Sequence, residues 1–282
     1  MTTLRSQKLA QQRAERCAED VIRRLNISSL PIDPSAIAAK HGISVVTMSQ
    51  DSGISGVLIK SGDSFGIGYS TRIQNEGLAR FTIGHELGHY FLAGHVDYLF
   101  QNNQSIHCSG TAFSSSELHE READFFSAAL LMPEFLFVPA LRRTGKGFSA
   151  IKQLAELCVT SLTATSIRFA NFAEDPLAVI VSAGNRIDFC GLSPSLADVS
   201  GVSAFKKGDF LPAGTRTERF NMDQNNAGTC NEVGVFASLD DWFEDAPQIE
   251  MKEDVVGLGN YGKTLTVLFT EEIIEDEADE RE

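Results

Sequence analysis

The segment from Phe81 to Tyr90 most constrains what this chain can be. It reads FTIGHELGHY, with two histidines four residues apart and a glutamate directly after the first. The apolar pattern around it predicts a buried helix over about 78–93. Residues four apart lie on the same helical face, so His85 and His89 can bind one metal ion. Burying these side chains without a binding partner would be unfavourable.

Glu86 follows the first histidine and would lie beside the ion rather than on it. In that position it can accept a proton from an attacking water molecule and pass it to a leaving amine. Zinc is the expected metal, because it lowers the pKa of water to about 7. Manganese and iron are alternatives, since two histidines and one carboxylate can hold them too. The motif therefore predicts a hydrolytic metal site.

A catalytic metal needs a third protein ligand, and the segment 117–131, ELHEREADFFSAALL, offers one. It is predicted to be a helix that ends before a proline. Glu120 and Asp124 lie four residues apart on one face, and the small residues Ala123 and Ser127 would let this helix pack closely on the first. Glu120 would then ligate the metal, and Asp124 would accept a hydrogen bond from a ligand histidine.

Two other side chains compete for the role of third ligand. Glu122 projects to a different face from Glu120 and is expected to be solvated. His95 follows His89 by six residues, which is the spacing found in metzincins, but Leu92 stands where that pattern requires glycine. Glu120 is the favoured ligand, and the other two remain alternatives.

The regions around this pair of helices predict further elements of an α+β protein. Upstream, the pattern indicates a helix over 8–25, a short helix capped by Asp33, and a small antiparallel sheet. The strands of that sheet are expected at residues 43–48, 56–60 and 65–69. Residues 101–116 are rich in Asn, Ser and Gly and are interpreted as a loop, with His107 and Cys108 as ordinary loop residues.

Downstream, residues 148–171 predict two short helices with a turn at 159–161, which resembles a helix-turn-helix. Base contacts would have to come from polar residues of the second helix, namely Thr163, Thr165, Ser166 and Arg168. A packing role is favoured instead, because the chain has a net charge of −14. Strands are expected at 177–182, 186–190 and 263–269, and a core is expected around Trp242, Phe243 and Phe236.

These patterns divide the chain into four parts. A helical zinc-peptidase core with the small sheet occupies 1–140, a short helical segment 141–175, and an α/β domain 176–270. Residues 271–282 hold eight acidic residues against one arginine, and we expect a disordered tail there.

Composition and segment length predict a cytoplasmic protein. The chain has no apolar run near the roughly 20 residues of a membrane helix and no apolar secretory signal. Its five cysteines are odd in number and lack CxxC spacing, which favours reduced thiols. The excess of acidic residues argues against a general nucleic-acid coat.

Three ordered blocks, LPIDPSAIAAKHGISV, RFTIGHELGHYFLAGH and EREADFFSAALLMP, resemble the ImmA/IrrE metallo-endopeptidases. The resemblance implies a gluzincin-like zinc endopeptidase with His85, His89 and Glu120 as ligands and Glu86 as the catalytic acid/base. Asp124 stands where the family usually has asparagine. Ser127 replaces a usual alanine, and neither departure removes a ligand.

The same resemblance implies a biological role and a partner. Members of this family typically cleave a helix-turn-helix repressor in response to stress or to induce mobile elements. IrrE-like proteins also carry a GAF-like sensor domain, for which residues 176–270 are the candidate. One alternative is a DNA-binding regulator whose peptidase-like domain is a sensor. The other is a non-catalytic module that holds a repressor by contact alone.

Overall fold

The computed structural model describes residues 4–49, 53–71, 73, 75–110 and 118–270. The chain divides into two compact units, residues 1–142 with 155–161 and residues 143–154 with 162–282. Each unit combines helices with one sheet, which confirms the α+β class. The finer division at 140 and 175 stays a prediction. The expected acidic tail at 271–282 lies outside the described residues.

Two helices of the first unit begin at residues whose side chains cap them. The Asp33 carboxylate accepts hydrogen bonds from the backbone N–H groups of Ser35 and Ala36, and the Asn75 side chain caps another helix through Leu78. The helices before residue 145 are α1 (Leu4–Arg24), α2 (Pro34–Lys40), α3 (Glu76–Phe91), α4 (His95–Leu99), the 3-10 turn η1 (Gln101–Asn103), α5 (Leu118–Leu131) and α6 (Glu134–Thr144).

The sheet of the first unit corrects two expectations. Its strands are β1 (Ser44–Met48), β2 (Ile54–Ser61), β3 (Ser64–Ser70) and β4 (Ile106–Gly110), in the order β1-β3-β2-β4. The sheet is mixed rather than antiparallel, because β1 lies parallel to the free edge of the β2–β3 hairpin. The segment 101–116, expected to be a loop, contains β4, which pairs with β2. A strand of five mostly polar residues has little sequence signal, and its pairing with β2 holds it in place.

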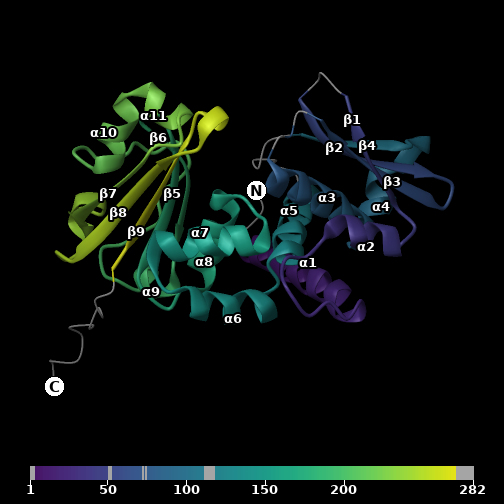
Figure 1. Ribbon diagram of the computed structural model, residues 1–282, viewed down its shortest axis with the longest axis horizontal. Coiled ribbons are helices and arrows are strands. Elements are labelled where there is room, and N and C mark those ends of the chain that lie inside the picture. The colour runs from purple at the N-terminus through teal and green to yellow at the C-terminus, as the bar shows by residue number, and fades with distance from the viewer. Residues whose placement is uncertain (1–3, 50–52, 72, 74, 111–117, 271–282) are drawn as a thin grey trace. The chain divides into compact units, whose positions relative to one another are not determined.

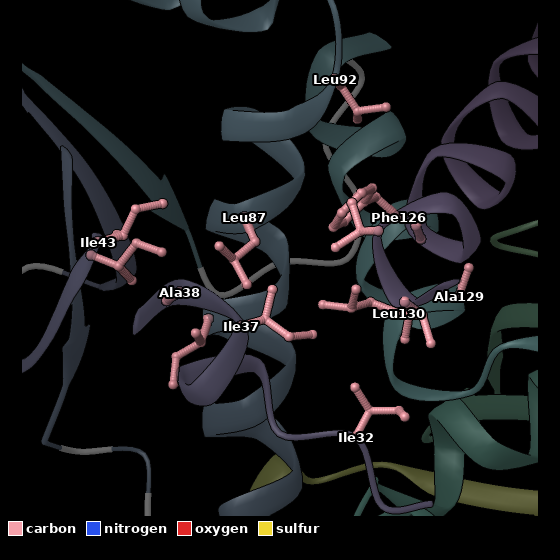
Figure 2. Packing of buried hydrophobic residues seen from close by; sticks show 14 of the residues in the cluster. Ile32, Ile37, Ala38, Ile43, Leu87, Leu92, Phe126, Ala129 and Leu130 are labelled. Carbon is pink, nitrogen blue, oxygen red and sulfur yellow. The ribbon is translucent and has the colours of Figure 1, made fainter. Parts of the chain in front are cut away.

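The core of this unit lies around α3. Figure 1 shows the sheet on one side of α3, which also packs against α5, and α5 in turn packs against α1. Figure 2 shows Leu87 of α3 near Ile37 of α2 and Phe126 of α5, which belong to the same buried cluster. All three side chains are fully buried or nearly so. Burying each of these large apolar side chains stabilises the fold by about 1.5–3 kcal/mol.

The predicted pair of helices after the core is confirmed as α7 (Gly147–Cys158) and α8 (Leu162–Phe172). The break between them falls at Val159, which adopts a positive φ of 53°. On α8 the side chains of Thr165, Ser166 and Arg168 are buried. Three of the four polar residues considered for contact with DNA are therefore not exposed.

The second unit is built on a five-stranded antiparallel sheet in the order β6-β5-β9-β8-β7. The three predicted strands are confirmed as β5, β6 and β9, whereas β7 and β8 were not predicted. The strands are β5 (Leu177–Ala183), β6 (Arg186–Leu192), β7 (Glu232–Ser238), β8 (Glu250–Gly257) and β9 (Thr264–Phe269). The short helices are α9 (Pro194–Ala197), α10 (Arg216–Met222), α11 (Gln224–Gly228), α12 (Leu239–Trp242) and the 3-10 turn η2 (Gly259–Tyr261).

Trp242 and Phe243 belong to the core of this unit, as expected. The expectation was wrong for Phe236, whose side chain is 76% exposed. Phe236 lies on the edge strand β7, where exposure alternates from residue to residue, and it falls on the outer face.

Two further observations concern the chain as a whole. None of its five cysteines, all within the described ranges, forms a disulfide.

No single described helix is both long and apolar enough to cross a membrane. Only α5 and α6 taken together, bent by 57° at their junction, reach that length and composition.

Candidate metal centre

The structure brings the side chains of His85, His89 and Glu120 together in the first unit. The two Nε2 atoms lie 3.0 Å apart. The Glu120 carboxylate reaches both rings, with Oε2 at 3.3 Å from His85 Nε2 and Oε1 at 3.3 Å from His89 Nε2. One α3 turn thus supplies both histidines, and α5 supplies the carboxylate.

These atoms fit a divalent cation. Around a tetrahedral ion with ligand bonds of roughly 2.0–2.1 Å, neighbouring ligand atoms are expected about 3.3 Å apart. The three measured separations, 3.0, 3.3 and 3.3 Å, agree with that spacing. Two imidazole nitrogens and one carboxylate also form a common donor set for zinc, manganese or iron.

Glu86 lies beside this cluster and is fully buried. Neither of its carboxylate oxygens accepts a hydrogen bond from another described residue. Burial raises the pKa of Glu86, and the nearby charge of His85 opposes the shift only in part. Gly56 of β2 makes room for the carboxylate, because a Cβ there would stand 2.5 Å from Glu86 Oε1. The site therefore holds a desolvated carboxyl group whose pKa lies above that of an exposed glutamate.

His85 is held by carboxylates on both sides of its ring. Its Nδ1 lies 2.8 Å from Asp124 Oδ1, and Asp124 lies one helical turn from Glu120 on α5. Burial lowers the pKa of His85, but hydrogen bonds to Asp124 and Glu120 outweigh that effect and raise it to about 10. The centre therefore favours a positive charge at the place where the ligand atoms meet.

The pKa values of Glu120 and His89 are shifted in the directions that suit metal binding. Burial would raise the pKa of Glu120, but hydrogen bonds from His107, His85 and His89 lower it far below its ordinary value. Burial is also the main cause that lowers the pKa of His89, to about 3. At neutral pH Glu120 is thus a carboxylate and His89 a neutral imidazole, the forms that bind cations.

The two alternative ligands lie outside this group of converging atoms. Glu122 is 2% exposed rather than solvated, and it pairs with Arg13 and His95. The ring of His95 contacts the far nitrogen of His89, at 3.1 Å between the two Nδ1 atoms. Burial lowers the pKa of His95, which Glu122 opposes by hydrogen bonding.

His107 was not recognised from the sequence as part of the site. It lies on β4, and its Nε2 is 3.1 Å from Glu120 Oε1 and 3.4 Å from Ser109 Oγ. Its ring also packs against His89, with centroids 4.7 Å apart. Only the pairing of β4 with β2 places this histidine at the cluster, and no local pattern in an Asn- and Ser-rich segment signals that pairing.

The fold is of the α+β class, and the cluster of two histidines and one glutamate could hold a metal ion. Residues 38–168 match the family model of the IrrE N-terminal-like domain, peptidase M78. The model matched by residues 38–168 is thus that of the family to which the resemblance with the ImmA/IrrE proteins pointed. No curated protein sequence matches the chain significantly.

The fold is also similar to that of a solved structure, a Mycobacterium tuberculosis transcriptional regulator. The alignment covers 91% of this chain and 75% of that protein, with a TM-score of 0.55. The two sequences are 15% identical, so the similarity concerns the fold alone.

Proposed function

We propose that this protein is a zinc-dependent endopeptidase in which His85, His89 and Glu120 bind the metal and Glu86 is the catalytic residue. The observation that carries the proposal is the convergence of two imidazole nitrogens and one carboxylate within 4.8 Å, next to a buried glutamate. The peptidase M78 match over residues 38–168 supports a hydrolytic role for that cluster.

The metal, when bound, would supply a Lewis acid that polarises a peptide carbonyl and makes water more acidic. Glu86 takes the proton from the attacking water on a carboxylate oxygen and delivers it to the departing amine. Its raised pKa, caused by burial, matches it to that task better than an exposed glutamate. Asp124 orients the His85 ring, and His107 holds the Glu120 carboxylate through Nε2.

The resemblance to ImmA/IrrE proteins extends the proposal to the substrate. We expect a limited cut in a protein partner, a helix-turn-helix repressor, as part of a stress or mobile-element response in the cytoplasm. A gluzincin-like core in the first unit and a GAF-like sensor in the second belong to the same hypothesis. For the sensor, the support is the antiparallel sheet with its short helices.

The test is incubation of the full-length protein with a helix-turn-helix repressor encoded near its gene, with and without a metal chelator. We expect cleavage that the chelator stops. Glu86→Gln should lower the cleavage rate by about 10²-fold or more while zinc stays bound. Glu76→Gln is the matched control, because Glu76 is an exposed glutamate on the same helix. Cleavage by Glu86→Gln at the wild-type rate would overturn the assignment.

A DNA-binding regulator is the second candidate, favoured by the name of the structurally similar protein. Its test is a gel shift with DNA from the protein's own locus. Strong, salt-sensitive binding by a His85→Ala variant that no longer holds metal would favour this reading. A third reading is a module that holds a repressor without cutting it, and for such a module Glu86→Gln would change nothing.

A further inference from the structure

A series of polar side-chain contacts begins at His89 Nδ1, the ring nitrogen that faces away from the proposed metal. His89 Nδ1 lies 3.1 Å from His95 Nδ1, and His95 Nε2 lies 3.1 Å from Glu122 Oε2. The other carboxylate oxygen, Glu122 Oε1, accepts a hydrogen bond of 2.7 Å from Arg13 Nη2. His89 and His95 are fully buried and Glu122 is 2% exposed, so water does not compete for these contacts.

Only one placement of protons satisfies every contact when His89 Nε2 binds a cation. The Arg13 guanidinium can only donate, and the carboxylate beside it accepts on both oxygens. His95 must then donate from Nε2 to Glu122, which leaves Nδ1 of a neutral ring as an acceptor. His89 in turn must donate from Nδ1. Its Nε2 lone pair is therefore free and directed at His85 and Glu120.

The reverse arrangement would disable the site. If the His95 proton were on Nδ1, the Nδ1 atom of His89 would have to accept, and its own proton would move to Nε2. A protonated Nε2 cannot ligate a metal. The position of one proton on His95 thus decides whether His89 can act as a ligand.

We propose that His95, Glu122 and Arg13 are positioning residues that keep the His89 proton on Nδ1 and direct its Nε2 at the metal. This inference rests on the proposed function. The two ligand histidines are then supported differently at their Nδ1 atoms, since that of His85 contacts a carboxylate directly at 2.8 Å and that of His89 reaches one through His95. Arg13 lies on α1, before the residues that the family model matches, so α1 is part of the metal site.

The direct test is the protonation of the two rings in the zinc-loaded full-length protein, read from long-range ¹H–¹⁵N spectra of labelled histidine. We expect His89 to carry its proton on Nδ1 and His95 on Nε2. A His95 ring that carries its proton on Nδ1, or on both nitrogens, would overturn the proposal.

The second test is the zinc dissociation constant, measured by competition with a chelator. Partners of ligand histidines typically affect metal affinity by about 10- to 100-fold, so His95→Leu should weaken binding by that factor. Arg13→Met, at a half-exposed position, should weaken it several-fold and serves if His95→Leu does not fold. The matched control is Arg16→Met on the exposed face of α1, which should change affinity by less than about twofold.

A variant of a proposed metal ligand, Glu120→Gln, distinguishes failure of the positioning role from failure of the proposed metal site. If Glu120→Gln abolishes zinc binding while His95→Leu and Arg13→Met bind as wild type, the metal site stands and the positioning role is wrong. If Glu120→Gln also keeps full zinc affinity, the proposed metal site fails and the positioning role with it.

Discussion

Gly84 of α3 lies so close to Ser127 of α5 that a Cβ on the glycine would stand 2.5 Å from Ser127 Oγ. The Ser127 hydroxyl donates a hydrogen bond of 2.7 Å to the carbonyl oxygen of Phe81, which also lies on α3. One turn later, a Cβ on Gly88 would lie 3.0 Å from the Cα of Ala123. Because α3 carries two of the proposed ligands and α5 carries the third, the distance between these helices sets the geometry of the metal centre.

The first prediction concerns this helix contact. Gly84→Ala should destabilise the metal-free protein by about 1–3 kcal/mol, because the added methyl overpacks the interface. It should also weaken zinc binding, since Glu120 is moved away from the histidines. Urea unfolding and chelator competition measure the two effects. Alanine favours a helix over glycine by about 1 kcal/mol. A variant more stable than wild type would therefore show that the contact is unimportant.

Two controls accompany that variant. Adding Ser127→Ala removes the Oγ atom and leaves Ser127 Cβ, at 3.3 Å, as the nearest atom, so most of the stability should return. Gly66→Ala on β3 should be nearly neutral, because its Cβ would meet only Ser44 O at 3.7 Å.

The second prediction concerns the space beside the proposed catalytic carboxylate. In Gly56→Ala the new Cβ would stand 2.5 Å from Glu86 Oε1 and 2.7 Å from Thr82 Cγ2, so the Glu86 side chain must move. A displacement near 1 Å can cost on the order of 10²-fold in rate. We expect kcat to fall by that order while the zinc dissociation constant changes little. Unchanged turnover would mean that the position of Glu86 is not critical.

The third prediction is that zinc binding releases protons. In the metal-free protein the pKa of His85 is raised to about 10, so the ring is protonated at neutral pH, and a ligand must be neutral. Each ion bound should release at least one proton, and apparent affinity should rise about tenfold per pH unit until the pH approaches that pKa. Calorimetry in buffers of different ionisation enthalpy counts the protons.

Asp124→Asn is the informative comparison for that measurement. Hydrogen bonding to Asp124 is one of the main causes that raise the pKa of His85. The variant should therefore release fewer protons at neutral pH. Equal proton release from both proteins would contradict the assignment of the proton to His85.

The fourth prediction concerns the thiols. Burial raises the pKa of Cys158 to about 12 and that of Cys190 to about 11, so both are almost entirely thiols at mildly alkaline pH. Cys108 and Cys230 are exposed. Iodoacetamide should alkylate the exposed pair and spare the buried Cys158 and the half-buried Cys190, as read by peptide mass spectrometry. Denaturant should make all four reactive. Labelling of Cys158 in the folded protein as fast as Cys230 would contradict this account.

Sequence-local features were predictable without a structure. The spacing of His85 and His89 requires only that one helix form, and the capping of α2 by Asp33 depends on residues within one turn. The break between α7 and α8 was visible for the same reason. Such features follow from short-range geometry, which the residues concerned impose on their own.

Tertiary packing decided which distant groups face the two histidines. Glu120 and Glu122 are two residues apart, and the rotation of α5 about its axis turns one toward the cluster and the other toward Arg13 and His95. That rotation depends on contacts between helices far apart in sequence. The same holds for His107, which reaches Glu120 only because β4 pairs with β2. A sequence lists every candidate ligand, but long-range contacts select among them.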